Sequence, residues 1–184
     1  IGLAEYDATV MRLRRAAVLL FAKNPDKCPQ SRIRFLRVLG TELSSGAQYN
    51  VSRDETVPGN LFELVQKSWE HLRSFLVQRT EFGGDARFEQ KYIYPESACR
   101  EALVNAIAHR DYTSHNGTEI YVFDDRIEIK NPGALLSSLT VDDLERLEGD
   151  HESRNVLVAR VLRENKFMRE LGEGMKRIFG AMQE

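Results

Sequence analysis

The stretch REALVNAIAHRDY, from Arg100 to Tyr112, sets an acid, an amide and an imidazole into a run of small apolar residues. Glu101, Asn105 and His109 follow one another at intervals of four residues. Because an α-helix repeats about every 3.6 residues, the three side chains share one face of a predicted helix. An amide inside an apolar helix needs a partner that satisfies it, so this face is a candidate ligand site.

The rest of the sequence predicts an α+β fold around this helix. Helices are expected over 4–23 and 60–79, the second with Asn60 as its N-cap, and strands over 31–40, 48–57 and 87–95. Residues 117–133 predict a hairpin around the turn Asp124-Asp125-Arg126. A short helix is expected within 138–153, a longer one over 154–165 and a last one at the end of the chain.

The composition excludes several classes of protein. Apolar residues at 42% and charged residues at 29% describe a soluble globular chain, and no apolar run approaches the length of a membrane span. A net charge of −2 argues against a broad basic surface that binds nucleic acid along the whole chain. Cys28 and Cys99 match no zinc spacing, and we expect reduced thiols in a cytoplasmic protein. Without a starting methionine or a signal-like opening, we expect a piece of a longer protein.

Two glycine turns lie where the predicted elements meet. The hairpin ends in Asn131-Pro132-Gly133, and the last helix begins at Gly172-Glu173-Gly174. A helix that starts after such a turn favours an anion, because unpaired N–H groups and the helix dipole both face it. An asparagine oxygen can complete a magnesium shell, and a carboxylate one turn earlier can orient a water toward phosphorus. Together these pieces predict an ATP–magnesium site without a Walker loop.

The chain resembles the part of bacterial RecG-related transcriptional regulators that follows their AlbA-type DNA-binding domain. The resemblance is densest in the motifs YPESACREALVNAIAHRDY, DDRIEIKNPG, RNVLVARVL and ELGEGMKRI. The C-terminal half is similar to their GHKL-type ATPase domain, the superfamily of gyrase, Hsp90, histidine kinases and MutL. The resemblance therefore implies a GHKL-like α/β sandwich over 90–184, with 1–89 extending its sheet or packing beside it. DNA would be contacted through flanking domains.

The resemblance also implies a role for each site residue. Glu101 corresponds to the water-activating base and Asn105 to the magnesium ligand. Asn131 stands where the superfamily has an aspartate that accepts from the adenine amino group, and Gly133 follows it. Gly172 and Gly174 correspond to the second glycine box, whose backbone faces the phosphates.

The sequence departs from this pattern in the first glycine box and in the candidate lid. Ala134, Leu135 and Leu136 replace residues that are usually glycine or proline in the related proteins. The lid, residues 141–152, carries six acids against Arg146 alone, and at close range such a charge would repel a triphosphate. We therefore expect nucleotide binding more readily than turnover.

Each candidate residue also has a structural alternative. Glu101 could stabilise its helix and pair with a nearby arginine, and His109 could cap the helix C-terminus. Arg154 and Asn155, which follow the acidic lid, either touch phosphate or only start the next helix. A zinc site at Glu101, Asn105 and His109 is disfavoured, because asparagine is a poor zinc ligand. A helicase motor is disfavoured as well, because the chain has no Gly-x-x-x-x-Gly-Lys-Ser/Thr loop.

The leading hypothesis is an ATP- and Mg²⁺-binding module of a bacterial transcription regulator, with ATP hydrolysis as its possible activity. The alternative is a degenerate GHKL-like domain that serves as a scaffold or a homodimerisation surface. In that case protein groups, not a ligand, would hold Asn105 and Asn131. An open pocket beside Asn105 would favour the first hypothesis, and a pocket filled by Leu135 and Leu136 would favour the second.

Overall fold

The computed structural model describes residues 2–7, 10–23, 31–76, 78–82, 87–136, 140–148, 152–169 and 174–183. Its centre is a four-stranded sheet with the strand order β4 (Val51–Pro58), β3 (Arg32–Val38), β7 (Thr118–Val122) and β8 (Ile127–Lys130). β3 and β7 are parallel, and the two outer pairs are antiparallel. The predicted α+β class with a mixed, mostly antiparallel sheet is confirmed.

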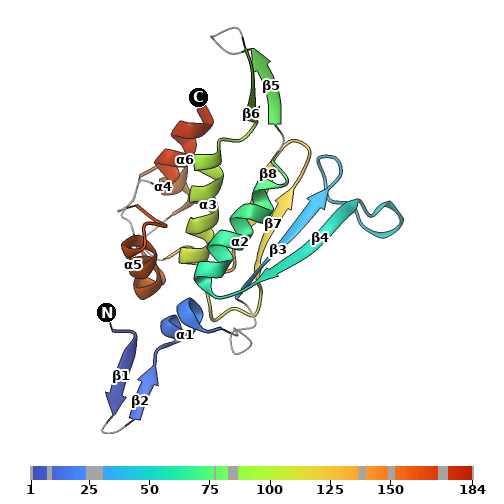
Figure 1. The fold of residues 1–184 in the computed structure, drawn as a ribbon. Helices are drawn as coiled ribbons and strands as arrows, with labels where there is room; N and C mark the ends of the chain where they lie inside the picture. The colour runs from blue at the N-terminus through green and yellow to red at the C-terminus, as the bar shows by residue number, and fades with distance from the viewer. Residues whose placement is uncertain are drawn as a thin grey trace.

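Alternation along β3 determines which face of the sheet is covered. Ile33 and Phe35 are buried in the main core, under the helices α2 (Leu61–Arg73) and α3 (Glu96–His109) (Figure 1). Arg34 lies on the opposite face, where its guanidinium donates to Asp54 of β4 and to Glu119 of β7. The sheet therefore has one apolar face covered by helices. The other face carries these ion pairs together with a smaller buried cluster built around Leu36 and Tyr121.

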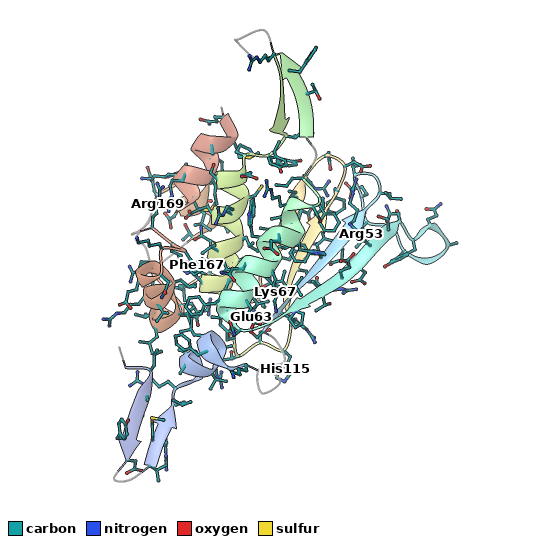
Figure 2. The ribbon with its side chains drawn as sticks, viewed as in Figure 1. Arg53, Glu63, Lys67, His115, Phe167 and Arg169 are labelled. Carbon is teal, nitrogen blue, oxygen red and sulfur yellow. The ribbon has the colours of Figure 1, made fainter. Side chains whose placement is uncertain are left out.

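Helix α2 follows its predicted pattern until its last turn. The Asn60 side chain accepts a 3.0 Å hydrogen bond from the Glu63 N–H, which confirms the predicted N-cap. Glu63 and Lys67 pair on the exposed side of the helix (Figure 2). The expectation of a helix to residue 79 is wrong beyond Arg73, because the Ser74 hydroxyl donates to the carbonyl of His71 and the chain then leaves the helix.

Helix α3 is buried on nearly every side. Apolar residues around its circumference belong to the core, with Leu103, Ile107 and Ala108 at most 1% exposed. Its remaining stripe faces the C-terminal helices α5 (Val156–Glu164) and α6 (Gly174–Gln183) (Figure 1). The short α4 (Val141–Glu145) begins with a reciprocal capping box between Thr140 and Asp143. The predicted hairpin forms as β7 and β8, as expected from its turn.

Two hairpins extend from this body (Figure 1): β1 (Ala4–Asp7) with β2 (Val10–Leu13), and β5 (Gln78–Phe82) with β6 (Phe88–Tyr92). The single helix predicted over 4–23 is therefore wrong in its first half, and only α1 (Arg15–Phe21) is helical. Antiparallel pairing puts Ala4, Tyr6, Met11 and Leu13 on one face of the hairpin, whereas Val10 lies on the other face opposite Asp7. A 3-10 helix, η2 (Gly46–Gln48), completes the elements of the described residues.

Residues before and after 90 share the sheet and the main core. β3 and β4 are sequence neighbours, yet β3 pairs with β7, whose residues come about half a chain later. The main core joins Leu20 and Phe35 with Ile107 and Leu162. The division at 89/90 falls inside β6, and residues 1–89 contribute β3 and β4 to the sheet that β7 and β8 complete.

Candidate functional site

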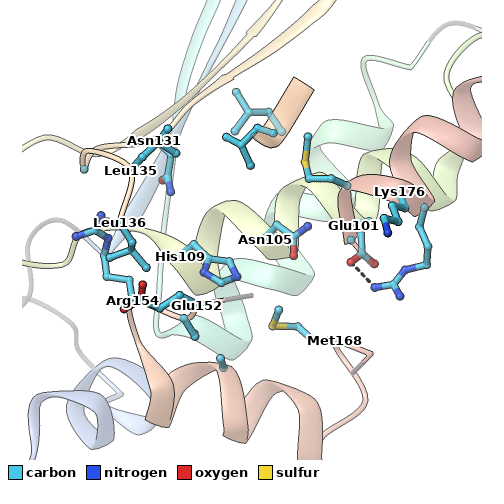
Figure 3. Close-up of a pocket in the computed structure, with 18 of the residues that line it drawn as sticks. Glu101, Asn105, His109, Asn131, Leu135, Leu136, Glu152, Arg154, Met168 and Lys176 are labelled. Atoms are coloured by element: carbon cyan, nitrogen blue, oxygen red, sulfur yellow. Dashed lines mark hydrogen bonds and ion pairs between the residues drawn. The ribbon is translucent and has the colours of Figure 1, made fainter. Parts of the chain in front are cut away.

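The face of α3 that carries Glu101, Asn105 and His109, called the acid–amide stripe below, faces a cavity of about 860 Å³. Glu101, Asn105 and His109 all line it, and Figure 3 shows the three side chains along one side of the helix. A volume of this size lies within the range of small-molecule sites in proteins. The one-face arrangement predicted from the four-residue spacing is what brings these groups together.

The other walls come from segments distant in the sequence. The loop after β8 contributes Asn131 to Leu136, α4 contributes Leu144, and α5 and α6 close the remaining sides. Leu135 and Leu136 lie at the rim, with Leu135 46% exposed, and they do not fill the space beside Asn105 (Figure 3). The pocket beside Asn105 is open.

Helix α6 begins directly over the acid–amide stripe. A Cβ placed on Gly174 would lie 2.7 Å from Asn105 Nδ2 and 2.9 Å from Glu101 Oε1. A side chain at this position would displace the ends of Asn105 and Glu101, so glycine lets the start of α6 approach α3 without disturbing these two groups. Gly172, the other predicted glycine of this turn, lies outside the described residues.

Glu101 is paired with an arginine of α6. Arg177 Nη2 donates to Glu101 Oε1 at 2.7 Å, and the two side chains are 28% and 19% exposed. Arg177 follows Gly174 by one helical turn, so both residues lie on the face of α6 that meets α3. The structure thus contains the arginine partner that was the structural alternative for Glu101.

The Asn105 amide has no hydrogen-bond partner among the residues that the structure describes. It is partly buried and lines the cavity, where its oxygen can still accept or ligate. One amide oxygen, with water and phosphate oxygens, fits what Mg²⁺ takes at a nucleotide site. A cluster of three or more His, Cys, Asp or Glu side chains suited to a metal is not present in the described ranges, so protein groups alone do not form a cage.

Asn131 is held by the protein on both sides of its amide. Its Oδ1 accepts from Thr118 Oγ1 at 2.7 Å, and its Nδ2 donates to the carbonyl of Ala106 at 2.9 Å. These bonds tie the end of β8 to β7 and to α3. The oxygen keeps a second lone pair, so adenine recognition by Asn131 is compatible with this arrangement but is not required to explain it.

Gly133 has a positive φ of 120° in a crowded turn. A Cβ there would lie 3.0 Å from Asp111 Cβ and 3.4 Å from the guanidinium of Arg154. The backbone N–H of Asp111 donates to the Pro132 carbonyl, and Arg154 Nη2 donates to the Ala134 carbonyl. The pKa of Asp111 is lowered, first by its hydrogen bonds from Thr113 and then by the charge of Arg154. The loop after β8 is therefore fixed against the end of α3.

The two residues after the lid have different positions. Arg154 lines the cavity while bonding the Ala134 carbonyl. Asn155 is not among the cavity-lining residues, and its Nδ2 donates to the carbonyls of Ala108 and Arg110 at 2.9 and 2.7 Å. Those carbonyls belong to the end of α3, where helical partners run out. Asn155 thus closes the C-terminus of α3 beside His109, the last helical residue.

Basic side chains outnumber acidic ones in the cavity wall. The basic residues are Arg154, Arg163, Arg169, Lys176 and Arg177, and the acids are Glu101, Glu148 and Glu152. Among the described lid acids, Asp142, Asp143 and Glu145 do not line the cavity, and position 150 lies outside the described residues. The acidic lid therefore does not make the pocket itself acidic, and the wall favours an anion.

Sequence reasoning did not identify Arg163, Arg169, Lys176 or Arg177 as cavity residues. Only Arg177 carried a usable signal, because it lies three residues after Gly174 and so on the same face of a helix that starts there. The others depend on how α5 and the segment after it fold back on α3.

Further features bear on the class of the protein. Cys99 is buried and free, and burial raises the pKa of its thiol to about 11. Cys28 lies outside the described residues. Within the ranges given above, no helix combines the length and apolarity that crossing a bilayer requires.

Comparison with known proteins places the C-terminal region in context. Residues 115–184 match the family described as "Putative ATP-dependent DNA helicase recG C-terminal", an ATPase-like family, which supports a RecG-related, HATPase-type region and a nucleotide-binding module. No curated protein matches the chain. The crystal structure of the DIP2311 protein from Corynebacterium diphtheriae superposes with a TM-score of 0.73 at 19% identity, over 92% of this chain. That match shows the fold, and it spans 32% of the length of DIP2311.

Proposed function

We propose that the cavity beside α3 binds ATP with magnesium. The observation that carries the proposal is the Asn105 amide, which faces an 860 Å³ cavity without a partner among the described residues. Close packing of Gly174 against it brings the start of α6 to the same point. A helix N-terminus and five basic side chains in the wall both favour a polyphosphate there.

In this proposal the site residues divide into two ends. Asn105 would hold the magnesium ion, which when bound neutralises charge on the phosphates. Gly174, with Gly172 of the same motif, would present backbone to the phosphates. Arg154, whose guanidinium lies beside Gly133, would add positive charge at the other end of the cavity. Asn131 and Gly133 would frame the base at the end of β8. Asn155 acts on this site only through the end of α3 that it holds.

Hydrolysis would depend on Glu101. A carboxylate on the same stripe as the magnesium ligand, one turn earlier, is suited to orient a water for attack on the terminal phosphorus. Here that carboxylate is bound to Arg177. We therefore propose that ATP binding is the primary property and that hydrolysis is slow, in a cytoplasmic bacterial transcription regulator that contacts DNA through other segments.

The test is calorimetric titration of the chain with ATP and Mg²⁺, beside Asn105→Ala. Magnesium-dependent binding should be lost in that variant. Asn165→Ala is the matched control, because Asn165 ends α5 with a bond to the Val161 carbonyl and does not line the cavity. Equal affinity of wild type and Asn105→Ala would refute the assignment of Asn105.

A second function, a scaffold or homodimerisation domain, is supported by Asn131. Both ends of its amide are engaged by Thr118 and Ala106, as that alternative predicts for Asn131, although not for Asn105. The β1–β2 hairpin adds an exposed apolar face, with Tyr6 at 77% and Met11 at 53% exposure. A folded chain that binds no ATP at millimolar concentration, yet sediments as a concentration-dependent dimer, would establish this function in place of the first.

A further inference from the structure

We propose that Arg177 binds the terminal phosphate of the nucleotide and that Glu101 competes with that phosphate for its guanidinium. The inference rests on the proposed ATP site and goes further, because it assigns a residue that the motifs do not mark. In the structure Arg177 Nη2 donates to Glu101 Oε1 at 2.7 Å, so the guanidinium is already paired with a carboxylate.

The location of the pair supports a role in the cavity beyond holding two helices together. Both residues line the cavity, and neither is fully buried, at 28% and 19% exposure. Glu101 Oε1 also lies next to the point where Gly174 starts α6, since a Cβ there would be 2.9 Å from it. An anion drawn to the start of α6 would therefore arrive beside the carboxylate that holds Arg177.

A phosphate is a stronger partner for this guanidinium than the carboxylate. The planar guanidinium can donate two parallel bonds to phosphate, and a terminal phosphate carries more charge than a single carboxylate. The free-energy cost of moving the Arg177 guanidinium from Glu101 to the phosphate would be small, because it pairs with an anion in the cavity before and after the exchange. It would also release Glu101 from its ion pair, at the position where a water-orienting carboxylate is needed.

The two residues therefore have opposite effects on nucleotide affinity. Glu101 acts as an internal competitor, so removing its charge should strengthen ATP binding. Arg177 acts as a ligand, so removing it should weaken ATP binding. ADP lacks the terminal phosphate, so its affinity should change much less in either variant.

The experiment is calorimetric titration of the full chain with ATP–Mg²⁺ and ADP–Mg²⁺, for wild type, Glu101→Gln, Arg177→Met and the double variant. We expect Glu101→Gln to tighten ATP binding and Arg177→Met to weaken it, each by about tenfold, the scale of one charge-assisted hydrogen bond. In the Arg177→Met background, Glu101→Gln should tighten ATP binding less than in wild type, because only the direct repulsion between carboxylate and phosphate is then removed.

Controls separate this inference from loss of fold and from failure of the ATP site. Arg160 and Glu164 form a similar pair on α5, Nε to Oε1 at 3.0 Å, and neither lines the cavity, so Arg160→Met and Glu164→Gln should leave ATP affinity unchanged. Thermal unfolding identifies variants that have lost structure. If wild type binds ATP but Glu101→Gln does not raise the ATP affinity, the competition between Glu101 and phosphate is refuted while the proposed ATP site is supported. If wild type binds no nucleotide, the ATP site fails, and the inference fails with it.

Discussion

Gly174 and Asn105 lie so close together that a Cβ on the glycine would be 2.7 Å from the amide nitrogen of Asn105. A methyl group at position 174 would therefore meet side chains of α3 at the start of α6. The atoms that would be displaced are the flexible ends of Asn105 and Glu101, the two groups proposed for magnesium and water.

Gly174→Ala should weaken ATP–Mg²⁺ binding by about tenfold while the chain stays folded, because the new methyl group displaces the Asn105 amide and one lost ligand bond is worth on the order of 1–2 kcal/mol. Titration calorimetry measures the change. Gly180→Ala is the control, because among the described residues nothing beyond its own helical turn and chain neighbours lies within 4 Å of a Cβ there. That change in mid-helix should stabilise the chain by roughly 0.5–1 kcal/mol and leave affinity unaltered. Unchanged binding in Gly174→Ala would show that the close approach does not matter for the site.

Asn131→Asp should destabilise the fold by roughly 1–3 kcal/mol, because a carboxylate cannot donate to the Ala106 carbonyl. The carbonyl oxygen would then face a negatively charged oxygen in place of the amide N–H. Urea unfolding followed by circular dichroism measures this loss. Thr118→Val, which removes only the other partner of the amide, should cost less. Equal stability of Asn131→Asp and wild type would contradict the hydrogen bonds seen here.

Asn155→Ala should lower the free energy of unfolding by roughly 1–3 kcal/mol, because it strips the carbonyls of Ala108 and Arg110 of their shared donor. Asn165→Ala, which removes a bond within one helix, should cost about 1 kcal/mol or less. Denaturant unfolding of the two variants gives the comparison. A larger loss in Asn165→Ala would mean that the end of α3 does not depend on Asn155.

Stability should fall with rising pH because of Cys99. Burial raises the pKa of its thiol from 9.0 to about 11, so the folded chain keeps a proton that the unfolded chain gives up. The contribution is complete below pH 9 and is lost between pH 9 and about 11, with a slope of roughly 1 kcal/mol per pH unit. Urea unfolding at pH 8 to 10, for wild type and Cys99→Ala, tests this. Parallel pH profiles for the two proteins would rule out Cys99 as the cause.

Local patterns predicted most of the elements and the common face of the site. The N-cap at Asn60, the helix that carries Glu101 and Asn105, and the β7–β8 hairpin each follow from residues within a few positions of one another. The two errors were local as well. The apolar run that follows favours extending a helix back to residue 4, whereas cross-strand pairing decides the structure of Ala4–Asp7 and Val10–Leu13.

Long-range partners could not be predicted. Arg177 and Glu101 are 76 residues apart in the sequence, and their pairing depends on the path that returns α6 to α3. The bonds from Asn131 to Thr118 and Ala106 similarly require β8 to lie against both β7 and α3. A motif can mark such a residue as important, but its partner follows from the tertiary structure.

The parallel pairing of β3 with β7 has a consequence for synthesis of the chain on the ribosome. β3 and β4 emerge before β7 and can form a hairpin, but the other edge of β3 pairs with β7, residues 118–122. Until those residues leave the exit tunnel, the apolar side chains of Ile33 and Phe35 lie beside an unpaired strand edge. Such an edge invites association with other nascent chains. We therefore expect this protein to engage chaperones early in its translation, and slow decoding before residue 118 to lower its soluble yield.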